Sequence, residues 1–228
     1  MLARRPVDLI SIAHSRAVRG ELDALLKYAS AHRLPVREVS DEELARLAQT
    51  THHEGLVMLV RPRRWAGPQE LAEQLLLRKG TAIALDRVRN PYNIGAILRT
   101  AAFFGVDAAL LGAPAPHPAL PPDAVRVAEG GAEHLLLSRT TDLADTLSRL
   151  RQRGVQIVGT AVVDAKDALS FPFARPSILV MGHEREGMSE RVGAQCDARV
   201  TIRGSGAVES LNVAVATGVL VAQLTRRA

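Results

Sequence analysis

The sequence predicts an α/β protein in which a small α/β domain precedes a larger domain built on a mostly parallel sheet. Short apolar runs alternate along the chain with segments of helical periodicity, and this alternation is typical of parallel strands joined by crossover helices. A segment with two prolines and a glycine, residues 61–68, interrupts the pattern and predicts a linker. The 228 residues are enough for one large or two modest domains.

The first domain, residues 1–60, contains five expected elements. We expect strands over residues 7–12, 36–39 and 55–60, and helices over residues 20–32 and from residue 40 onward. The second helix has the clearest start, because Ser40 is followed three residues later by Glu43, which is the pattern of a capping box.

The second domain, residues 81–228, follows a linker and leading helix over residues 61–80. We expect strands over residues 81–85, 108–111, 134–137, 155–159, 178–181 and 200–202, and helices over residues 93–105, 142–153 and 210–226. Ligands of parallel sheets bind at the carboxyl ends of the strands. We therefore expect the functional site in the loops after Leu85, Gly159, Met181 and Ile202.

Composition indicates a soluble globular protein, with 47% hydrophobic and 23% charged residues. The single cysteine, Cys196, excludes a disulfide framework and a cysteine-rich zinc site, and it fits a reducing cytoplasm. No apolar run has the length of a membrane span, and the N-terminus lacks the apolar core of a signal peptide. We therefore expect a cytoplasmic protein with no membrane partner.

The net charge of +5 comes from arginine, since the chain has only three lysines. A planar guanidinium suits phosphate, which favours a nucleic-acid partner, although genome composition explains arginine enrichment equally well. Arg61, Arg63 and Arg64 are candidate phosphate contacts in the linker. A solvated linker explains the same three side chains.

Several common chemistries have no motif in this chain. It contains no P-loop, no G-x-S-x-G elbow and no H-E-x-x-H helix, and Glu209 stands where Gly204-Ser-Gly206 would need its third glycine to form a dinucleotide loop. The stretch His52-His53-Glu54 predicts a surface turn rather than a metal site, because adjacent side chains point in different directions.

The first of three candidate segments at strand ends is residues 85–100. Asn93 is placed to cap the helix that follows it. Arg99 lies on an apolar stretch of this helix among small neighbours, which leaves room for its guanidinium in a cleft. Such an arginine must be paired with a carboxylate or face a polar site.

The second and third segments are residues 180–187 and 202–216. In the second, Gly182 and Gly187 let the backbone approach a ligand, and Glu184 puts a carboxylate at the mouth of a strand. An ordinary turn before a helix capped by Ser189 explains the same residues. In the third, a glycine-containing loop enters a helix at Ser210, with Asn212 in the first turn, and free N–H groups there attract anions.

Together the three segments resemble the signature motifs of the SpoU/TrmH family of RNA ribose methyltransferases, within the SPOUT superfamily. The matching residues are Asn93, Gly95, Arg99, Thr100 and Ala101, then Gly182, Glu184 and Gly187, then Ile202, Gly206, Ser210, Leu211, Asn212 and Val213. The resemblance covers residues 81–226 closely. It is looser over residues 7–60, which are similar to the family's small RNA-substrate domain.

The resemblance implies transfer of a methyl group from S-adenosylmethionine to a ribose 2′-OH of tRNA or rRNA, without a metal, in a domain whose C-terminal segment forms a trefoil knot. The positions implied for catalysis and substrate are Asn93, Arg99, Glu184, Ser210 and Asn212. Those implied to line the cofactor are Thr160, Gly182, Ile202 and Leu211. Because arginine stays protonated, we expect Arg99 to hold phosphate and stabilise the alkoxide rather than act as a base.

The chain departs from the family pattern in two motifs. Arg203-Gly204 stands where the family has Pro-Met, beside the adenine, and Asn90 stands where the family has aspartate. The N-terminus also begins late, without the first helix of the substrate domain. A non-catalytic RNA-binding protein that kept the fold is the first alternative. An unrelated α/β nucleotide-binding enzyme is the second, and the missing phosphate-loop motifs argue against it.

The last expected helix, residues 210–226, is apolar around nearly its whole circumference. Such a helix must be buried on more than one side, and the sheet covers only one. The same helix of a second copy would supply the other cover. We therefore expect a homodimer, which the family resemblance also implies, with Arg99 of one subunit reaching the partner's cofactor pocket.

Overall fold

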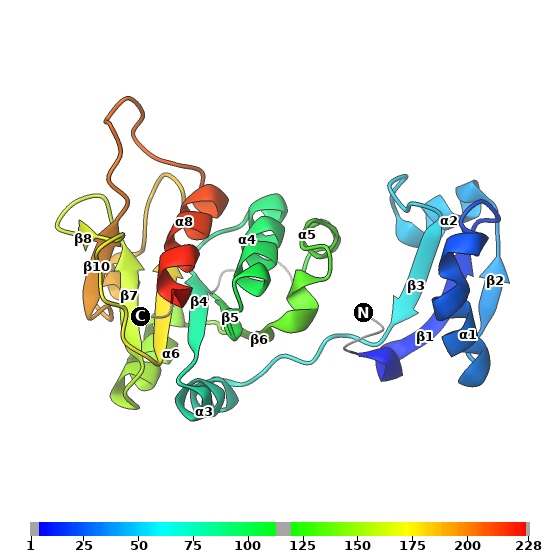
Figure 1. The fold of residues 1–228 in the computed structure, drawn as a ribbon, viewed down its shortest axis with the longest axis horizontal. Coiled ribbons are helices and arrows are strands. Elements are labelled where there is room, and N and C mark those ends of the chain that lie inside the picture. The colour runs from blue at the N-terminus through cyan, green and yellow to red at the C-terminus, as the bar shows by residue number, and fades with distance from the viewer. Residues whose placement is uncertain (1–4, 113–119, 227–228) are drawn as a thin grey trace. The chain divides into compact units, whose positions relative to one another are not determined.

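The computed structural model describes residues 5–112 and 120–226. The chain divides into two compact units, Met1–Arg63 and Arg64–Ala228, each with its own sheet (Figure 1). Along the described residues, no helix is both long enough and apolar enough to cross a membrane.

The described part of the smaller unit is a three-stranded sheet with two α-helices. Its strand order is β2-β1-β3, with β1 (Leu9–His14) parallel to β2 (Val36–Glu38) and antiparallel to β3 (Leu56–Val60). The helical elements are the short turns η1 (Pro6–Asp8) and η2 (Arg19–Leu22) and the helices α1 (Asp23–Ala31) and α2 (Asp41–Ala48). Leu9 and Ile12 of β1 pack with Leu25 and Ala29 of α1 in a small core.

Within its described residues, the larger unit forms a seven-stranded parallel sheet of order β6-β5-β4-β9-β7-β10-β8, which confirms the predicted sheet type. The strands are β4 (Thr81–Leu85), β5 (Ala108–Leu111), β6 (Leu136–Arg139), β7 (Gln156–Thr160), β8 (Lys166–Asp167), β9 (Ser177–Met181) and β10 (Ala198–Thr201). The helical elements are α3 (Pro68–Arg78), α4 (Pro91–Phe103), α5 (Pro122–Val127), η3 (Gly131–His134), α6 (Leu143–Gln152), α7 (Glu190–Gly193) and α8 (Val213–Thr225).

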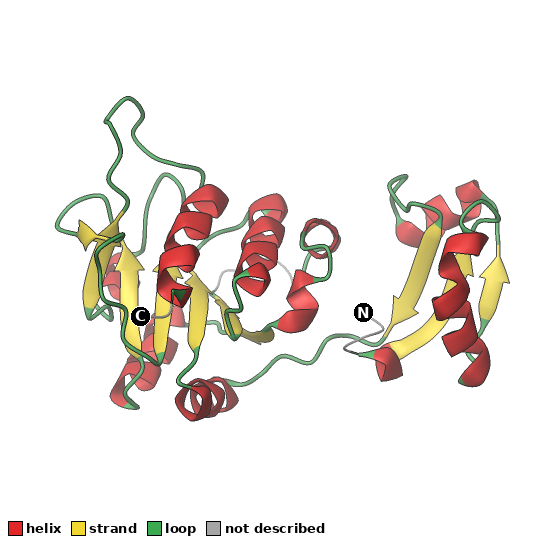
Figure 2. Cartoon of the chain, viewed as in Figure 1, coloured by secondary structure: helices red, strands yellow, loops and turns green. Residues whose placement is uncertain are grey.

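Helices cover both faces of this sheet (Figure 2). Successive residues of a strand point to opposite faces. In β4, Ile83 and Leu85 pack in a core with α4, α5 and α8, whereas Ala82 and Ala84 pack in a second core with α3, α6 and α7. This two-sided burial explains why the strand is a continuous apolar run rather than an alternating one.

The chain reverses its direction of travel across the sheet between β4 and β9. From β4 it continues to β5 and β6 on one side, whereas from β9 it continues to β10 on the other. The crevice at the carboxyl ends of two such neighbouring strands is the usual ligand site of an open parallel sheet. The loops that follow β4 and β9 both open at this edge.

The structure confirms the predicted cap of α2 and corrects the predicted starts of α4 and α8. Ser40 caps α2, and its Oγ accepts a hydrogen bond from the Glu43 amide at 3.3 Å. Asn90, not Asn93, caps α4 and accepts from the Tyr92 amide at 2.9 Å, because Pro91 begins the helix in the first position that proline favours. The last helix begins at Val213 rather than at residue 210, with Asn212 as its cap.

Other differences from the sequence prediction come from short elements. The first strand begins at Leu9 because residues 6–8 form the turn η1, and the strand expected over residues 134–137 is β6, displaced by the turn η3. Helix α5 and the two-residue strand β8 were not predicted. Neither is long enough to show a clear hydrophobic period.

Candidate active site

Asp86 and Arg87 tie together the loops that follow β4 and β9. Asp86 is buried and accepts a hydrogen bond from the Ser189 amide at 2.6 Å. Arg87 pairs with Glu186 at 2.5 Å and donates to the Gly187 carbonyl at 3.0 Å. Both residues lie in the candidate segment predicted from the sequence, residues 85–100, because they directly follow a buried strand, but no role was predicted for either of them.

The turn after β9 is closed by its own backbone and presents Glu184. His183 and Gly187 exchange backbone hydrogen bonds of 3.0 and 2.9 Å. Gly187 has a φ of +65°, which favours glycine. A Cβ on Gly182 would overlap the Gly187 carbonyl carbon and the Met188 nitrogen, so this tight turn requires glycine there.

Three polar side chains from distant parts of the sequence meet beside this turn. The Asn93 amide donates to Glu184 Oε1, and the Asn212 amide lies 3.2 Å from the same oxygen and 3.2 Å from Asn93 Oδ1. The Asn212 side-chain oxygen accepts from the Ala214 and Val215 amides at 2.8 and 3.4 Å. Asn212 therefore caps α8 with its side-chain oxygen and directs its side-chain NH2 group toward the Glu184 carboxylate.

This cluster of Asn93, Glu184 and Asn212 leaves one carboxylate oxygen free for a ligand. Both amides donate to Glu184 Oε1, so Oε2 keeps its capacity to accept a hydrogen bond. Glu184 and Asn212 are exposed and Asn93 is partly exposed. The cluster is thus a preorganised hydrogen-bond acceptor that a substrate can reach from solvent.

Arg99 does not join this cluster within one chain. Its guanidinium pairs with Glu129 at 2.7 Å, and both side chains are more than half exposed, at 56% and 62%. Asn93 and Arg99 are six residues apart in the sequence, which puts them about 120° apart around α4. The expected position in a cleft is therefore wrong for the single chain, where Arg99 is in a surface ion pair.

The positions implied for the cofactor lie at neighbouring strand ends. Thr160 ends β7 and donates its hydroxyl to the Val180 carbonyl at 3.1 Å, Gly182 follows β9, and Ile202 follows β10. Residues 203–212, which include Ser210 and Leu211, are all exposed. A ligand at this edge would meet small and aliphatic side chains beside an open loop.

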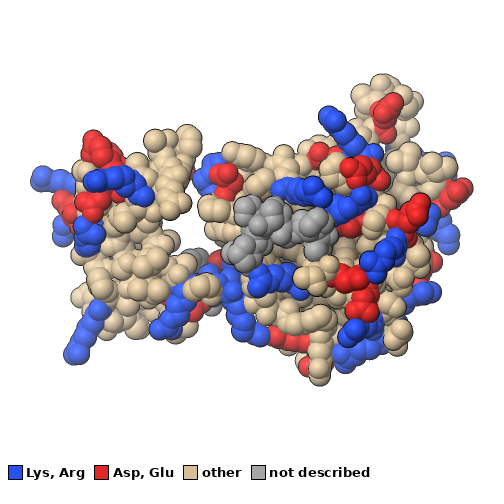
Figure 3. All heavy atoms as spheres, turned by 180° about the vertical axis from the view of Figure 1, so that it is seen from behind, with Lys and Arg blue, Asp and Glu red and all other residues tan. Residues whose placement is uncertain are grey.

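The three linker arginines have partners within the protein. Arg61 donates to the Val7 carbonyl at 3.4 Å, and Arg64 makes two hydrogen bonds to Glu70, at 2.5 and 2.7 Å. Arg63 also makes an interaction within the protein. On the face that Figure 3 shows, basic and acidic side chains of the larger unit are interspersed rather than gathered in one basic patch.

Two other features bear on the chemistry of the site: the thiol of Cys196 and the arrangement of side chains that could bind a metal ion. Burial raises the pKa of the Cys196 thiol to about 11, so the thiol stays protonated at neutral pH and is a poor nucleophile. Among the described residues, no group of three or more His, Cys, Asp or Glu side chains is arranged to hold a metal ion. Glu184, Asn93 and Asn212 are the polar side chains that meet at this edge of the sheet.

Two family models match the chain and together cover both units. The SpoU rRNA methylase family matches residues 80–222, which contain all three members of the cluster. The RNA 2′-O ribose methyltransferase substrate-binding family matches residues 2–66. This chain belongs to the SpoU rRNA methylase family. The resemblance of its motifs to SpoU/TrmH proteins is thereby confirmed.

Relatives of this SpoU protein are named as RNA methyltransferases. It is 38% identical to the 23S rRNA (guanosine-2′-O-)-methyltransferase RlmB of Pseudomonas aeruginosa, over 90% of this chain and 83% of that protein. It is 31% identical to the uncharacterized tRNA/rRNA methyltransferase YfiF of Escherichia coli O157:H7, over 98% of this chain but only 64% of that protein. The AdoMet-bound rRNA methyltransferase of Sinorhizobium meliloti shares the fold, with a TM-score of 0.81 and 24% identity over 95% of this chain and 79% of that one.

Proposed function

We propose that this SpoU protein transfers a methyl group from S-adenosylmethionine to a ribose 2′-OH of structured RNA, either rRNA or tRNA. The observation that carries the proposal is the hydrogen-bonded cluster of Asn93, Glu184 and Asn212 at the sheet's switch point. Family membership and the ribose methyltransferase named among its relatives support it.

The residues at the strand ends fit this cofactor. S-adenosylmethionine, when bound, supplies an electrophilic methyl group. Thr160, Gly182, Ile202 and Leu211 offer the small and aliphatic surface that suits an adenosine, and the exposed backbone of residues 203–212 offers donors and acceptors for its polar groups. We assign these residues to the cofactor and Ser210, in the same loop, to the substrate.

Glu184 is proposed to orient the ribose hydroxyl. Its free Oε2 accepts a hydrogen bond from the 2′-OH and thereby raises the electron density on the attacking oxygen. Asn93 and Asn212 hold the carboxylate in place before substrate binds, so no reorganisation is needed during the reaction. Arg99, supplied by a second subunit, holds the adjoining phosphate and stabilises the developing alkoxide.

Cofactor binding tests the proposal directly. Calorimetry on the full chain should detect S-adenosylmethionine binding without added metal. Gly182→Ala should weaken that binding by about tenfold or more, because the new Cβ must displace the turn after β9. Gly20→Ala is the matched control, since a Cβ at Gly20 meets open space, and its affinity should match wild type. A wild-type chain that binds no cofactor at millimolar concentration would favour the non-catalytic RNA-binding protein instead.

The smaller unit is proposed to bind the RNA substrate. The support is the match of residues 2–66 to the substrate-binding family. Arg61, Arg63 and Arg64 stay in this proposal as phosphate contacts in the linker segment, and RNA would compete with Glu70 for Arg64.

A homodimer through α4 and α8 is part of the same proposal. One face of α8 is buried in the chain's own core through Val213, Leu220 and Val221, whereas Val215 is exposed. Phe103, at the end of the neighbouring helix α4, is 83% exposed. A second subunit on these helices would cover both side chains and bring a second Arg99 to each site.

The dimer predicts a specific effect of charge at this face. Wild-type protein should scatter light as a dimer at low micromolar concentration, and Phe103→Glu should shift it toward monomer, because the charge would be buried without a partner. Leu77→Glu is the matched control: Leu77 is 81% exposed on α3, which packs on the opposite face of the sheet. Equal effects of the two substitutions, or a monomeric wild-type protein that is active, would rule out this interface.

Two further expectations belong to this proposal. The trefoil knot implied by the family resemblance is supported by the return of the chain from β10 to α8, which packs against α4 and β9. The cytoplasmic location expected from the single cysteine stays a prediction.

A further inference from the structure

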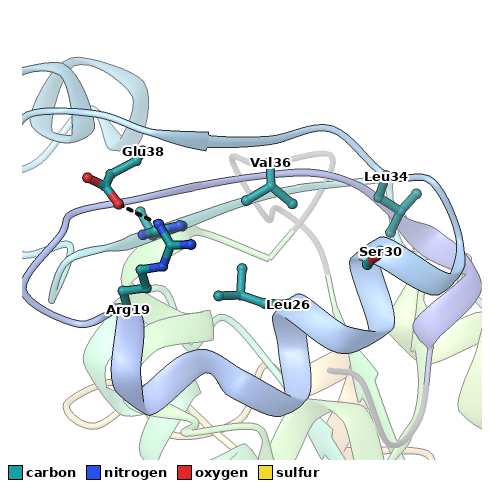
Figure 4. A pocket seen from close by; sticks show the side chains of 7 residues that line it. Arg19, Leu26, Ser30, Leu34, Val36 and Glu38 are labelled. Atoms are coloured by element: carbon teal, nitrogen blue, oxygen red, sulfur yellow. Dashed lines mark hydrogen bonds and ion pairs between the residues drawn. The ribbon is translucent and has the colours of Figure 1, made fainter.

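The smaller unit contains a cavity of about 330 Å³ that the proposed reaction does not use (Figure 4). Residues of β1, η2, α1 and β2 and of the loop before β2 line it. Figure 4 shows Leu26 of α1 and Val36 of β2 facing each other across the hollow, with Arg19 and Glu38 at one end and Leu34 toward the other. The cavity is therefore a slot with aliphatic walls, whose polar end is the Arg19–Glu38 pair and whose other end carries the Ser30 hydroxyl.

The polar end of the slot carries little net charge. Arg19 Nη1 lies 3.1 Å from Glu38 Oε2, and both side chains keep substantial exposure, at 66% and 40%. Their charges offset each other, so the slot is a poor site for a phosphate, which requires an excess of positive charge. A neutral ligand with a polar edge fits better.

A buried histidine adds a further polar group. His14 also lines the cavity and is only 2% exposed. Its Nδ1 donates to the Ser15 carbonyl at 2.9 Å, because a carbonyl oxygen can only accept. Nε2 is the ring nitrogen left for a ligand.

We propose that this slot binds an unstacked guanine base of the RNA substrate, an inference that rests on the proposed function. Flat aliphatic walls suit the two faces of a base, and sequence-specific RNA recognition commonly reads unstacked bases through hydrogen bonds at their edges. A cavity of about 330 Å³ is at the small end of the roughly 300–1,000 Å³ range of ligand sites, which suits one base.

The polar end selects guanine among the four bases. Guanine presents two adjacent donors, N1–H and N2–H, which match the Glu38 carboxylate, and beside them the acceptor O6, which matches the Arg19 guanidinium. Adenine would instead place its N1 lone pair against the carboxylate, and two acceptors repel. Cytosine and uracil have only one ring, and neither presents two adjacent donors.

Methyl NMR on the full chain tests the assignment with free nucleotides as probes. Guanosine 5′-monophosphate should shift the methyl signals of Leu26 and Val36, and adenosine 5′-monophosphate should bind there at least about fivefold more weakly. Glu38→Gln should weaken the binding of guanosine 5′-monophosphate by about tenfold or more, because the substitution removes a charge-assisted acceptor. Glu43→Gln is the matched control: it also breaks an arginine–glutamate pair, with Arg37 at 2.5 Å, but Glu43 does not line the cavity.

The outcomes separate this inference from the proposed function. Equal binding of the two nucleotides at these methyls, no shift with either nucleotide, or equal affinities of Glu38→Gln and Glu43→Gln would overturn the guanine slot. S-adenosylmethionine binding is measured on the same samples. Absence of S-adenosylmethionine binding would overturn the proposed reaction. The guanine slot would still be tested by the nucleotide titrations alone.

Discussion

Replacing Glu184 with glutamine should lower methyl transfer by about 100-fold to 1,000-fold, the usual loss when one preorganised polar group at the reacting oxygen is removed. The substitution keeps the shape of the side chain but removes its charge. The single oxygen that remains can accept from the Asn93 and Asn212 amides as Oε1 does now, which puts the new NH2 group in the place of Oε2. The ribose hydroxyl would then face a donor in place of its acceptor.

The measurement is single-turnover transfer of a labelled methyl group to unmodified rRNA and tRNA transcripts. Calorimetry and thermal melting should show near wild-type cofactor binding and stability, since Glu184 is exposed. Glu190→Gln, an exposed glutamate at the start of α7, is the control and should stay within about twofold of wild type. Full activity of the Glu184→Gln protein would remove this residue from the mechanism.

Arg99→Ala should abolish methyl transfer while cofactor binding and melting temperature stay near wild type. Among the described residues Arg99 makes a surface ion pair with Glu129, a contact worth about 0–1 kcal/mol, so we expect a small structural cost of its removal. A large loss of stability would mean instead that the pair has a structural role. Glu129→Ala, which breaks the same pair but keeps Arg99, is the control and should retain activity.

Mixed dimers test whether Arg99 acts across the subunit interface. Arg99→Ala and Glu184→Gln proteins, each inactive alone, would be co-expressed with different tags and assayed together. If Arg99 serves the partner's site, each mixed dimer holds one intact site, and random assembly should restore about a quarter of wild-type activity. If Arg99 serves its own chain, no mixed dimer holds an intact site and activity stays absent.

Local sequence signals predicted the strands of the larger unit well, for a physical reason. Strands buried on both faces must be apolar at successive positions, and the expected bounds of β4 and β5 agree with the structure. Boundaries set by local turns were less predictable. Asn90 and Asn93 both suit a helix cap, and only the position of Pro91 in the folded helix decides between them.

The sequence by itself determined the family, the parallel sheet and the choice of Asn93, Glu184 and Asn212 as candidate site residues, because motif spacing and strand-end position are properties of the linear chain. Only the tertiary structure decided how these residues interact. The contact between Asn93 and Asn212 spans 119 residues and exists because α8 packs against α4, whereas Glu184 reaches Asn93 because β4 and β9 are neighbours in the sheet. The same fold turns Arg99 away from the cluster, since helical periodicity puts it on another side of α4. It also makes the slot around His14, which depends on how α1 packs on its sheet and has no signature in the sequence.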